Sequence, residues 1–256
     1  MEYLIIITNL ILTLPSIIFH GLKLCYIKKI KYRNHTNILY NASRTNNLIL
    51  MVHGHNGHPG DFEHLAKYLL KNNHIKDNWN IYACKFAKLD NHSSIESEIK
   101  QIDDYLNNNH YETVILVGLS KGGLTCCSYY ANRKLNNNKI SKIITISSPL
   151  YGTRVANKFL PSFLEKIFPN TKKIKNELGY NSNIALNTSS ILSSIEDISI
   201  YHVVPQYDHL IYPVTSAKYY FTPENNIYYC KGFKYSHIGI LYNQDVVKCI
   251  ENWICK

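Results

Sequence analysis

Several features that would mark other classes of protein are missing from this sequence. It contains no Cys-x-x-Cys pair, and its 7 cysteines are an odd number, so we expect small buried side chains in a reducing compartment instead of a disulfide framework. It has no internal repeat, which argues against a repeat architecture. Lys and Arg outnumber Asp and Glu by 28 to 18, for a net charge of +10. However, no basic stripe is interleaved with aromatic residues, so nucleic acid is not an expected partner.

The chain does contain enough apolar material for one large domain. Its 256 residues are 45% hydrophobic and 18% charged, a composition typical of globular proteins with a substantial core. No stretch resembling a domain linker follows residue 35. We therefore predict one domain over residues 36–256, preceded by a separate hydrophobic segment within residues 1–35.

The first segment has no charge over residues 3–19, and a basic flank follows it. Because the positive residues lie on the C-terminal side of the apolar run, the pattern predicts a membrane anchor or interfacial helix, with the rest of the chain in the cytoplasm. A secretory signal peptide and a helix packed on the domain are the alternatives. Asn9 and Pro15 weaken the interpretation as a simple spanning helix.

Beyond this segment, strand patterns alternate with helix patterns. Apolar residues recur at helical spacing over residues 62–70, 94–106, 124–131 and 244–254. Short apolar runs predict strands over residues 37–40, 47–52, 79–84, 113–118, 143–146, 198–204 and 226–230. Asp61 is expected to cap the first of the helices. This alternation predicts an α/β fold with a mostly parallel central sheet and helices on both faces.

The most informative stretch, Gly118-Leu-Ser120-Lys-Gly122, joins a predicted strand to a predicted helix. A serine on such a sharp turn points outward, needs small neighbours, and lies at a helix N-terminus that favours developing negative charge. Ser120 is therefore a candidate nucleophile, with Gly118 and Gly122 as its small neighbours. The alternative is an ordinary glycine-rich turn in which Ser120 caps the helix.

A serine nucleophile needs a base, and the base needs a carboxylate to orient it. In a parallel sheet, such groups collect where the strands end. Asp208 and His237 each follow a predicted strand, which makes them the candidate acid and base, although each could instead be a plain turn or loop residue. His209 is a poorer base because it adjoins Asp208. Asp197, the reserve carboxylate, precedes its strand.

From about residue 45 onward, the sequence resembles the lipase and esterase branch of the α/β-hydrolases, including deacylases that act on lipid anchors. Val52-His53-Gly54-His55-Asn-Gly57 is similar to the oxyanion loop of that family, and the Ser120 turn is similar to its nucleophile elbow. Ser148-Pro-Leu-Tyr-Gly-Thr153 resembles another family segment. The stretches Asp208–Pro213 and His237–Ile240 resemble the acid and histidine segments.

This resemblance implies an α/β-hydrolase fold and a serine mechanism. Ser120 would attack an ester carbonyl, His237 would carry the proton, and Asp208 would orient His237. The backbone N–H groups of His55 and Lys121 would bind the oxyanion. His55 and Lys121 themselves depart from the residues common in the family, which we expect to affect the pocket more than the mechanism.

The sequence allows two other interpretations. His53, His55 and His58 resemble the zinc ligands of metallo-β-lactamase-fold hydrolases, which would make a zinc-dependent hydrolase, but Gly57 stands where the acidic ligand belongs. If they bind no metal, we expect His58 and His64 to be exposed and His53 to be buried at a strand end. The second alternative is a hydrolase-fold scaffold that has lost catalysis and acts as a membrane-bound binding module.

Residues 154–195 contain no strand pattern and form an insertion where α/β-hydrolases carry a lid. Apolar residues recur there at helical spacing and would line an acyl pocket or face a bilayer, with core packing as the alternative: Phe159, Leu160, Phe163, Leu164, Ile167 and Phe168. Lysines in the same stretch would attract anionic lipid. We therefore expect a carboxylic ester of a lipid as substrate, a membrane surface as partner, and neither a metal ion nor an organic cofactor.

Overall fold

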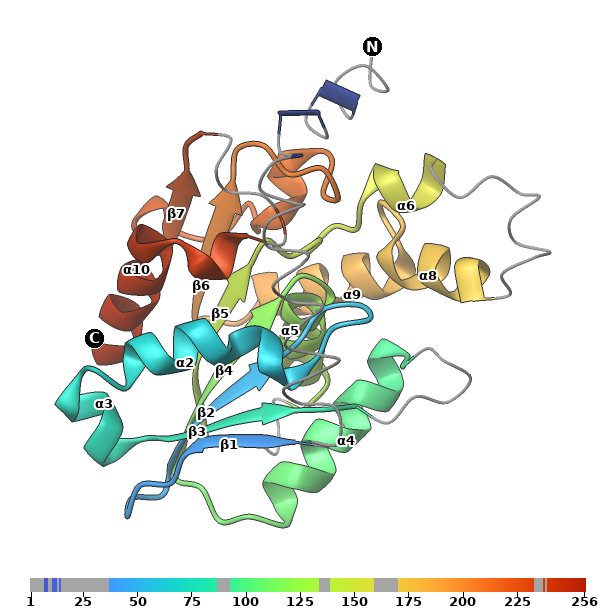
Figure 1. The fold of residues 1–256 in the computed structure, drawn as a ribbon. Coiled ribbons are helices and arrows are strands. Elements are labelled where there is room, and N and C mark those ends of the chain that lie inside the picture. Colours follow the sequence, from blue (N-terminus) through green and yellow to red (C-terminus); the bar gives the residue numbers. More distant parts are fainter. Residues whose placement is uncertain are drawn as a thin grey trace.

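The computed structural model describes residues 37–86, 93–133, 139–158, 170–232, 237 and 239–256, together with residues 7, 8, 11, 12 and 14. Its centre is a seven-stranded sheet in the order β1-β3-β2-β4-β5-β6-β7 (Figure 1). The strands are β1 (Ile38–Asn41), β2 (Asn47–Val52), β3 (Asn80–Cys84), β4 (Thr113–Leu119), β5 (Ile140–Ile146), β6 (Ser199–Pro205) and β7 (Ile227–Cys230). β1 pairs antiparallel with β3, and the remaining strand pairs are parallel, which confirms the predicted mostly parallel sheet.

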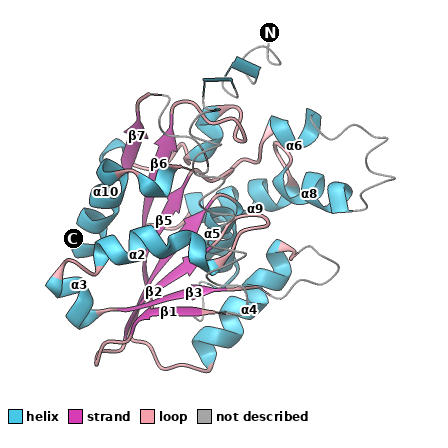
Figure 2. Cartoon of the chain, in the orientation of Figure 1, coloured by secondary structure: helices cyan, strands magenta, loops and turns pink. Residues whose placement is uncertain are grey.

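Helices cover both faces of this sheet (Figure 2). One face carries η2 (Pro59–Phe62), α2 (Glu63–Leu69), α3 (Asn73–Asn78) and α10 (Gln244–Cys255), and the other carries α4 (Ile95–Asn107), α5 (Lys121–Arg133) and α9 (Asn183–Ser193). Side chains alternate between the faces along a strand, so Ile49 packs under the first set of helices and Leu50 under the second. A strand covered on both sides needs apolar residues at every position, which explains the unbroken run in β2.

The helix ends follow from local hydrogen bonds, and two of them were not predicted. Asp61 belongs to η2, where its carboxylate accepts a hydrogen bond from the backbone N–H of His58 at 2.9 Å. The prediction that Asp61 caps the following helix is therefore wrong, since α2 begins only at Glu63. The short helix α3 was also missed; the side chain of Asn72 caps it by accepting from the N–H of His74 at 3.0 Å.

The insertion between β5 and β6 is helical where the structure describes it. It contains α6 (Arg154–Lys158), α8 (Asn170–Leu178) and α9, and α9 packs against α5. Oγ of Ser128 on α5 lies 2.8 Å from Oγ1 of Thr188 on α9, so this helix is joined to the body of the domain. The apolar residues between positions 159 and 168 lie outside the described residues, and a lid role for the insertion stays a prediction.

Most of residues 1–35 likewise lie outside the described residues. Within the part of the chain that the structure does describe, no helix is both long enough and apolar enough to cross a membrane. The membrane-anchor prediction therefore concerns a segment of which the structure describes only a few positions.

The described cysteines are free thiols, as predicted. Four of them are buried in the core: Cys84, Cys126, Cys127 and Cys230. Burial raises the pKa of the Cys84 thiol to about 12, which keeps it neutral and unreactive at physiological pH.

His202, on β6, is a titratable side chain inside the core. Its Nδ1 atom lies 2.7 Å from Oγ1 of Thr145, and its Nε2 atom lies 2.9 Å from Oγ1 of Thr222. Burial, with a smaller contribution from the positive charge of Lys218, lowers the pKa of His202 to about 3. The imidazole is therefore neutral in the folded protein over the whole physiological range.

Acid should destabilise the protein partly through this histidine. The unfolded chain takes up a proton at an ordinary histidine pKa of 6.5, whereas folded His202 does so only at about 3. Because the unfolded state binds more protons between these values, the free energy of unfolding should fall by several kcal/mol as pH drops through this interval. Denaturant unfolding of His202→Gln, measured from neutral pH down to about pH 4, should show a shallower acid dependence. An equal dependence in both proteins would contradict this assignment.

Candidate active site

The turn between β4 and α5 holds Ser120 in a left-handed backbone conformation, with a φ of 54°. The motif glycines are needed for close backbone packing around it. A Cβ atom on Gly118 would lie 2.4 Å from Cα of Gly123, and one on Gly122 would lie 2.1 Å from the carbonyl oxygen of Val52. The N–H of Ser120 donates to the carbonyl of Ile146 at 2.9 Å, which ties the turn to the end of β5. The predicted strand, sharp turn and helix are all present.

Ser120, predicted from its turn, meets Asp208 and His237, predicted from strand-end positions, at the carboxyl edge of the sheet. Nε2 of His237 lies 2.8 Å from Oγ of Ser120, although the two residues are 117 positions apart. Nδ1 of His237 lies 2.9 Å from Oδ2 of Asp208. Asp208 and His237 are 2% and 8% exposed, whereas Ser120 is half-buried. Ser120 is therefore the most exposed of three residues in a hydrogen-bonded chain whose other two members are shielded from water.

The carboxylate of Asp208 is held on both of its oxygens. Oδ1 accepts hydrogen bonds from the backbone N–H groups of Leu210 and Ile211, at 2.8 and 3.1 Å. Burial alone would raise the pKa of Asp208, but the charge and hydrogen bond of His237, with smaller contributions from His209 and the hydrogen bond of Ser147, together outweigh burial and bring that pKa below its ordinary value. Asp208 is thus a carboxylate at neutral pH and can orient the imidazole by accepting from its Nδ1 atom.

Ser147 is a member of this cluster that the sequence reading missed. Its hydroxyl donates to Oδ2 of Asp208, and its Oγ atom lies 3.1 Å from Nδ1 of His237. The strand-end rule that selected Asp208 would also have selected Ser147, which directly follows β5. The family resemblance instead drew attention to Ser148, whose hydroxyl donates to the carbonyl of Ile146 at 3.2 Å.

The loop that follows β2 lies against the serine. A Cβ atom on Gly54 would approach Cβ of Ser120 to 2.9 Å, so glycine is the residue that allows this contact. His53 is buried, as predicted, with Nδ1 2.9 Å from the carbonyl oxygen of Gly54 and its ring 5.3 Å from the ring of Phe86. His55 follows in the same loop and Lys121 begins α5 beside the serine. Their role as oxyanion donors stays a prediction.

The side chain of Lys121 is buried between α5 and α4. It is 1% exposed and forms a 2.7 Å ion pair with Glu98 on α4, while also donating to the carbonyl of Ser93. Thr125 donates to the second oxygen of Glu98 at 2.7 Å. Burial raises the pKa of Glu98 despite the nearby ammonium group. The side chain of Lys121 therefore joins α4 to α5, and its expected effect on the substrate pocket stays a prediction.

A family comparison assigns most of the chain to a known family. The model of a family described as the PGAP1-like alpha/beta domain matches residues 45–236, about three quarters of the chain. The chain belongs to the PGAP1-like alpha/beta domain family. The matched range includes Ser120 and Asp208 and ends one residue before His237. Among curated proteins, no sequence matches this chain.

Solved structures confirm the α/β-hydrolase fold of this PGAP1-like domain. A lipase-esterase related protein from Clostridium acetobutylicum is 17% identical with a TM-score of 0.59, covering 86% of this chain and 97% of its own. The monoacylglycerol lipase of Paleococcus ferrophilus is 18% identical with a TM-score of 0.59, covering 85% and 97%. A thioesterase domain from the curacin biosynthetic pathway is 14% identical with a TM-score of 0.55, covering 86% and 94%. At these identities the likeness concerns the fold.

The alternative metal site is not assembled in the PGAP1-like domain. Over the described residues, no group of three or more His, Cys, Asp or Glu side chains is arranged to hold a metal ion. His58 is buried, where exposure was expected, because its Nδ1 atom accepts the N–H of Gly60 at 3.0 Å and so caps η2. His64 is half-buried, with its ring 5.3 Å from the ring of Tyr242.

The two rejected acid and base candidates occupy other places. Asp197 accepts a hydrogen bond from the hydroxyl of Tyr130 at 3.2 Å, before β6 and away from Ser120. The His209 ring lies edge-to-face with the His237 ring, their centroids 6.1 Å apart. Burial lowers the pKa of His209 to about 4, so a neutral ring lies beside His237 and helps to exclude water.

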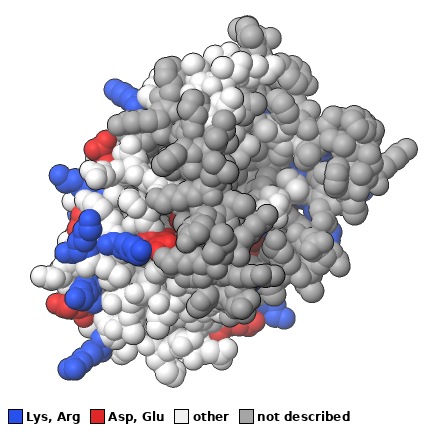
Figure 3. Space-filling model, in the orientation of Figure 1, with Lys and Arg blue, Asp and Glu red and all other residues white. Residues whose placement is uncertain are grey.

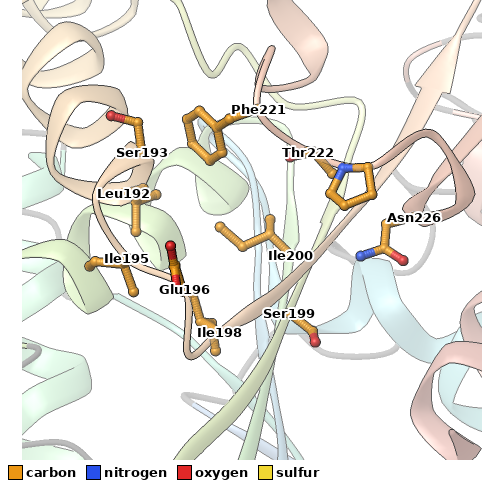
Figure 4. Close-up of a pocket in the computed structure, with 11 residues that line it drawn as sticks. Leu192, Ser193, Ile195, Glu196, Ile198, Ser199, Ile200, Phe221, Thr222 and Asn226 are labelled. Atoms are coloured by element: carbon orange, nitrogen blue, oxygen red, sulfur yellow. The ribbon is translucent and has the colours of Figure 1, made fainter.

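The surface of the PGAP1-like domain has a cavity far from the serine. It measures about 410 Å³ and is lined by residues before and within β6 and before β7, including Glu196, Ser199 and Phe221 (Figure 4). Because the strands are parallel, these residues lie at the opposite edge of the sheet from Ser120. On the face seen in Figure 3, the described Lys and Arg side chains are spread around the edge with Asp and Glu among them, without a continuous basic patch.

Proposed function

We propose that this protein is a serine hydrolase that cleaves carboxylic esters. The observation that carries the proposal is the pair of contacts made by one imidazole: Nε2 of His237 at 2.8 Å from Ser120 and Nδ1 at 2.9 Å from Asp208. Such a chain makes an ordinary hydroxyl nucleophilic by removing its proton as it attacks. If Ser120 only capped the helix α5, it would need neither the buried imidazole of His237 nor the buried carboxylate of Asp208.

The reaction divides into acylation and deacylation. In acylation, His237 takes the Ser120 proton at Nε2 while Oγ forms a bond to the ester carbonyl carbon. The backbone N–H groups of His55 and Lys121 stabilise the negative carbonyl oxygen, assisted by the N-terminus of α5. The carbon–oxygen bond of the ester then breaks, and the alcohol leaves with the proton held by His237. In deacylation, water attacks the acyl-enzyme by the same route and releases the carboxylic acid.

A lipid is the ester that the surroundings favour. The resemblance to lipases and esterases, which extends from about residue 45 onward, is one reason for this choice. The apolar run over residues 3–19 and the net charge of +10 favour work at an anionic membrane surface. We propose that the protein associates with such a surface through residues 1–35 and that the catalytic domain faces the cytoplasm.

Esters of graded chain length test both the serine mechanism and the preference for a lipid substrate. We expect p-nitrophenyl esters to be hydrolysed, with kcat/KM rising from the acetate to longer acyl chains because each added methylene buries apolar area. EDTA should leave the rate unchanged, because no step uses a metal ion. A preference for the acetate would contradict the lipid substrate while leaving the serine mechanism intact. Activity lost in EDTA and restored by zinc would contradict the mechanism itself.

A further inference from the structure

Ser147 holds an unusual backbone conformation at the end of β5. Its φ is 49°, a left-handed value that costs a non-glycine residue about 1–2 kcal/mol. Both sides of this strand end are fixed: the N–H of Ser147 donates to the carbonyl of Val203 at 2.9 Å, and the carbonyl of Ile146 accepts from Ser120 at 2.9 Å. Glycine would adopt this conformation without cost, so the presence of a serine suggests that its hydroxyl is used.

The hydroxyl of Ser147 reaches two members of the site at once. It is fully buried, donates to Oδ2 of Asp208, and has its Oγ atom 3.1 Å from Nδ1 of His237. These three atoms form a triangle, since Nδ1 also lies 2.9 Å from Oδ2. Oγ has one proton, which goes to the carboxylate, and its lone pairs can face the N–H of the imidazole. The Nδ1 proton therefore has two acceptors.

We propose that Ser147 is a positioning residue for the pair of Asp208 and His237. It fixes Oδ2 of the carboxylate and supplies the second acceptor that keeps the proton of His237 on Nδ1, leaving the Nε2 lone pair facing Ser120. This inference rests on the proposed function and extends it. It has a specific consequence: when the Asp208 carboxylate is removed, the Ser147 hydroxyl still holds the imidazole.

Two variants separate the hydroxyl from the backbone. Ser147→Ala and Ser147→Gly both remove the hydroxyl, but only glycine relieves the left-handed strain. We expect both to lower kcat by roughly 10- to 100-fold with little change in KM, the effect of one charge-assisted hydrogen bond. Ser148→Ala, which removes a buried hydroxyl that donates to the backbone carbonyl of Ile146, is the matched control. If the role were purely structural, the glycine variant would recover activity along with stability.

Two further readouts respond to proton position and not to folding. With one donor fewer, the Asp208 carboxylate should attract the imidazole proton more strongly, so the acidic limb of the kcat/KM profile should move to higher pH in Ser147→Ala. The downfield proton NMR signal of the Nδ1 proton should move in the same variant. Neither should change in Ser148→Ala.

A double-mutant cycle completes the test. Asp208→Ala should keep some activity, more than Ser120→Ala keeps. Adding Ser147→Ala to Asp208→Ala should lower this remaining activity by about a further tenfold. Ser147 variants that match Ser148→Ala in rate, pH profile and proton signal would overturn the inference. If Ser120→Ala and Asp208→Ala also left turnover intact, the proposed function itself would be overturned, so the two failures are distinguishable.

Discussion

Replacing Ser120 with alanine is expected to lower kcat by about 10⁴- to 10⁶-fold, because it removes the atom that forms the acyl-enzyme. The remaining activity would come from substrate binding and the oxyanion donors. Alanine has the same backbone preference as serine at a φ of 54°, so the turn should keep its shape. Initial rates on a p-nitrophenyl ester measure the effect, together with thermal unfolding to confirm that the fold is retained.

A matched serine provides the control for this substitution. Ser193 ends α9, is exposed, and donates only to the carbonyl of Ser190 at 2.8 Å. Ser193→Ala should therefore retain the full rate. Retention of more than about a tenth of the rate by Ser120→Ala would assign hydrolysis to some other group.

Replacing Glu98 with glutamine should produce a large loss of stability. Lys121 would keep its buried positive charge while losing its only carboxylate partner among the contacts described above, and such a loss costs about 3–5 kcal/mol of unfolding free energy. Urea unfolding followed by tryptophan fluorescence measures it. The change should also reach the site, because Lys121 adjoins Ser120 and its ammonium group joins the start of α5 to α4.

The pair of Glu63 and Lys67 is the control: it has the same 2.7 Å separation, but the Lys67 side chain is 68% exposed and the Glu63 side chain 10% exposed. Lys67→Ala should therefore cost clearly less stability than Glu98→Gln, because solvent screens the ammonium group of Lys67. The combined replacement of Glu98 by leucine and Lys121 by methionine should be far milder than Glu98→Gln, because it removes both charges together. If Glu98→Gln costs no more than Lys67→Ala, the buried ion pair does not fix this interface.

The sheet and the three distant site residues could be predicted because their signals are local. β2 and β4 are unbroken apolar runs, as strands covered on both faces must be, and a parallel sheet brings strand ends to one edge. Asp208 and His237 were found by that rule, without knowledge of their contacts. The helix α3 was missed because six residues capped by one asparagine leave little periodicity to detect.

The rest depends on contacts that no local pattern reveals. The Ser147 hydroxyl meets Asp208 across 61 positions, and one serine among many carries no mark of that contact. The side chain of Lys121 lies against α4 because it forms an ion pair with the buried carboxylate of Glu98, 23 residues earlier in the sequence. His58 was expected to be exposed, but it is buried, and its Nδ1 atom accepts a hydrogen bond from the backbone N–H of Gly60. The sequence pattern therefore predicts the candidate reacting residues, whereas the contacts that hold them in position depend on tertiary packing.

Labelling by a fluorophosphonate tests the central claim most directly, since that probe reacts with a serine only when a neighbouring base activates it. Intact-mass spectrometry should show one adduct, and peptide mapping should place it on Ser120. His237→Gln, which keeps the serine but removes its base, should abolish the labelling. A protein that gains no adduct, or one that is labelled equally after His237→Gln, would contradict the account and leave a hydrolase fold without its activity.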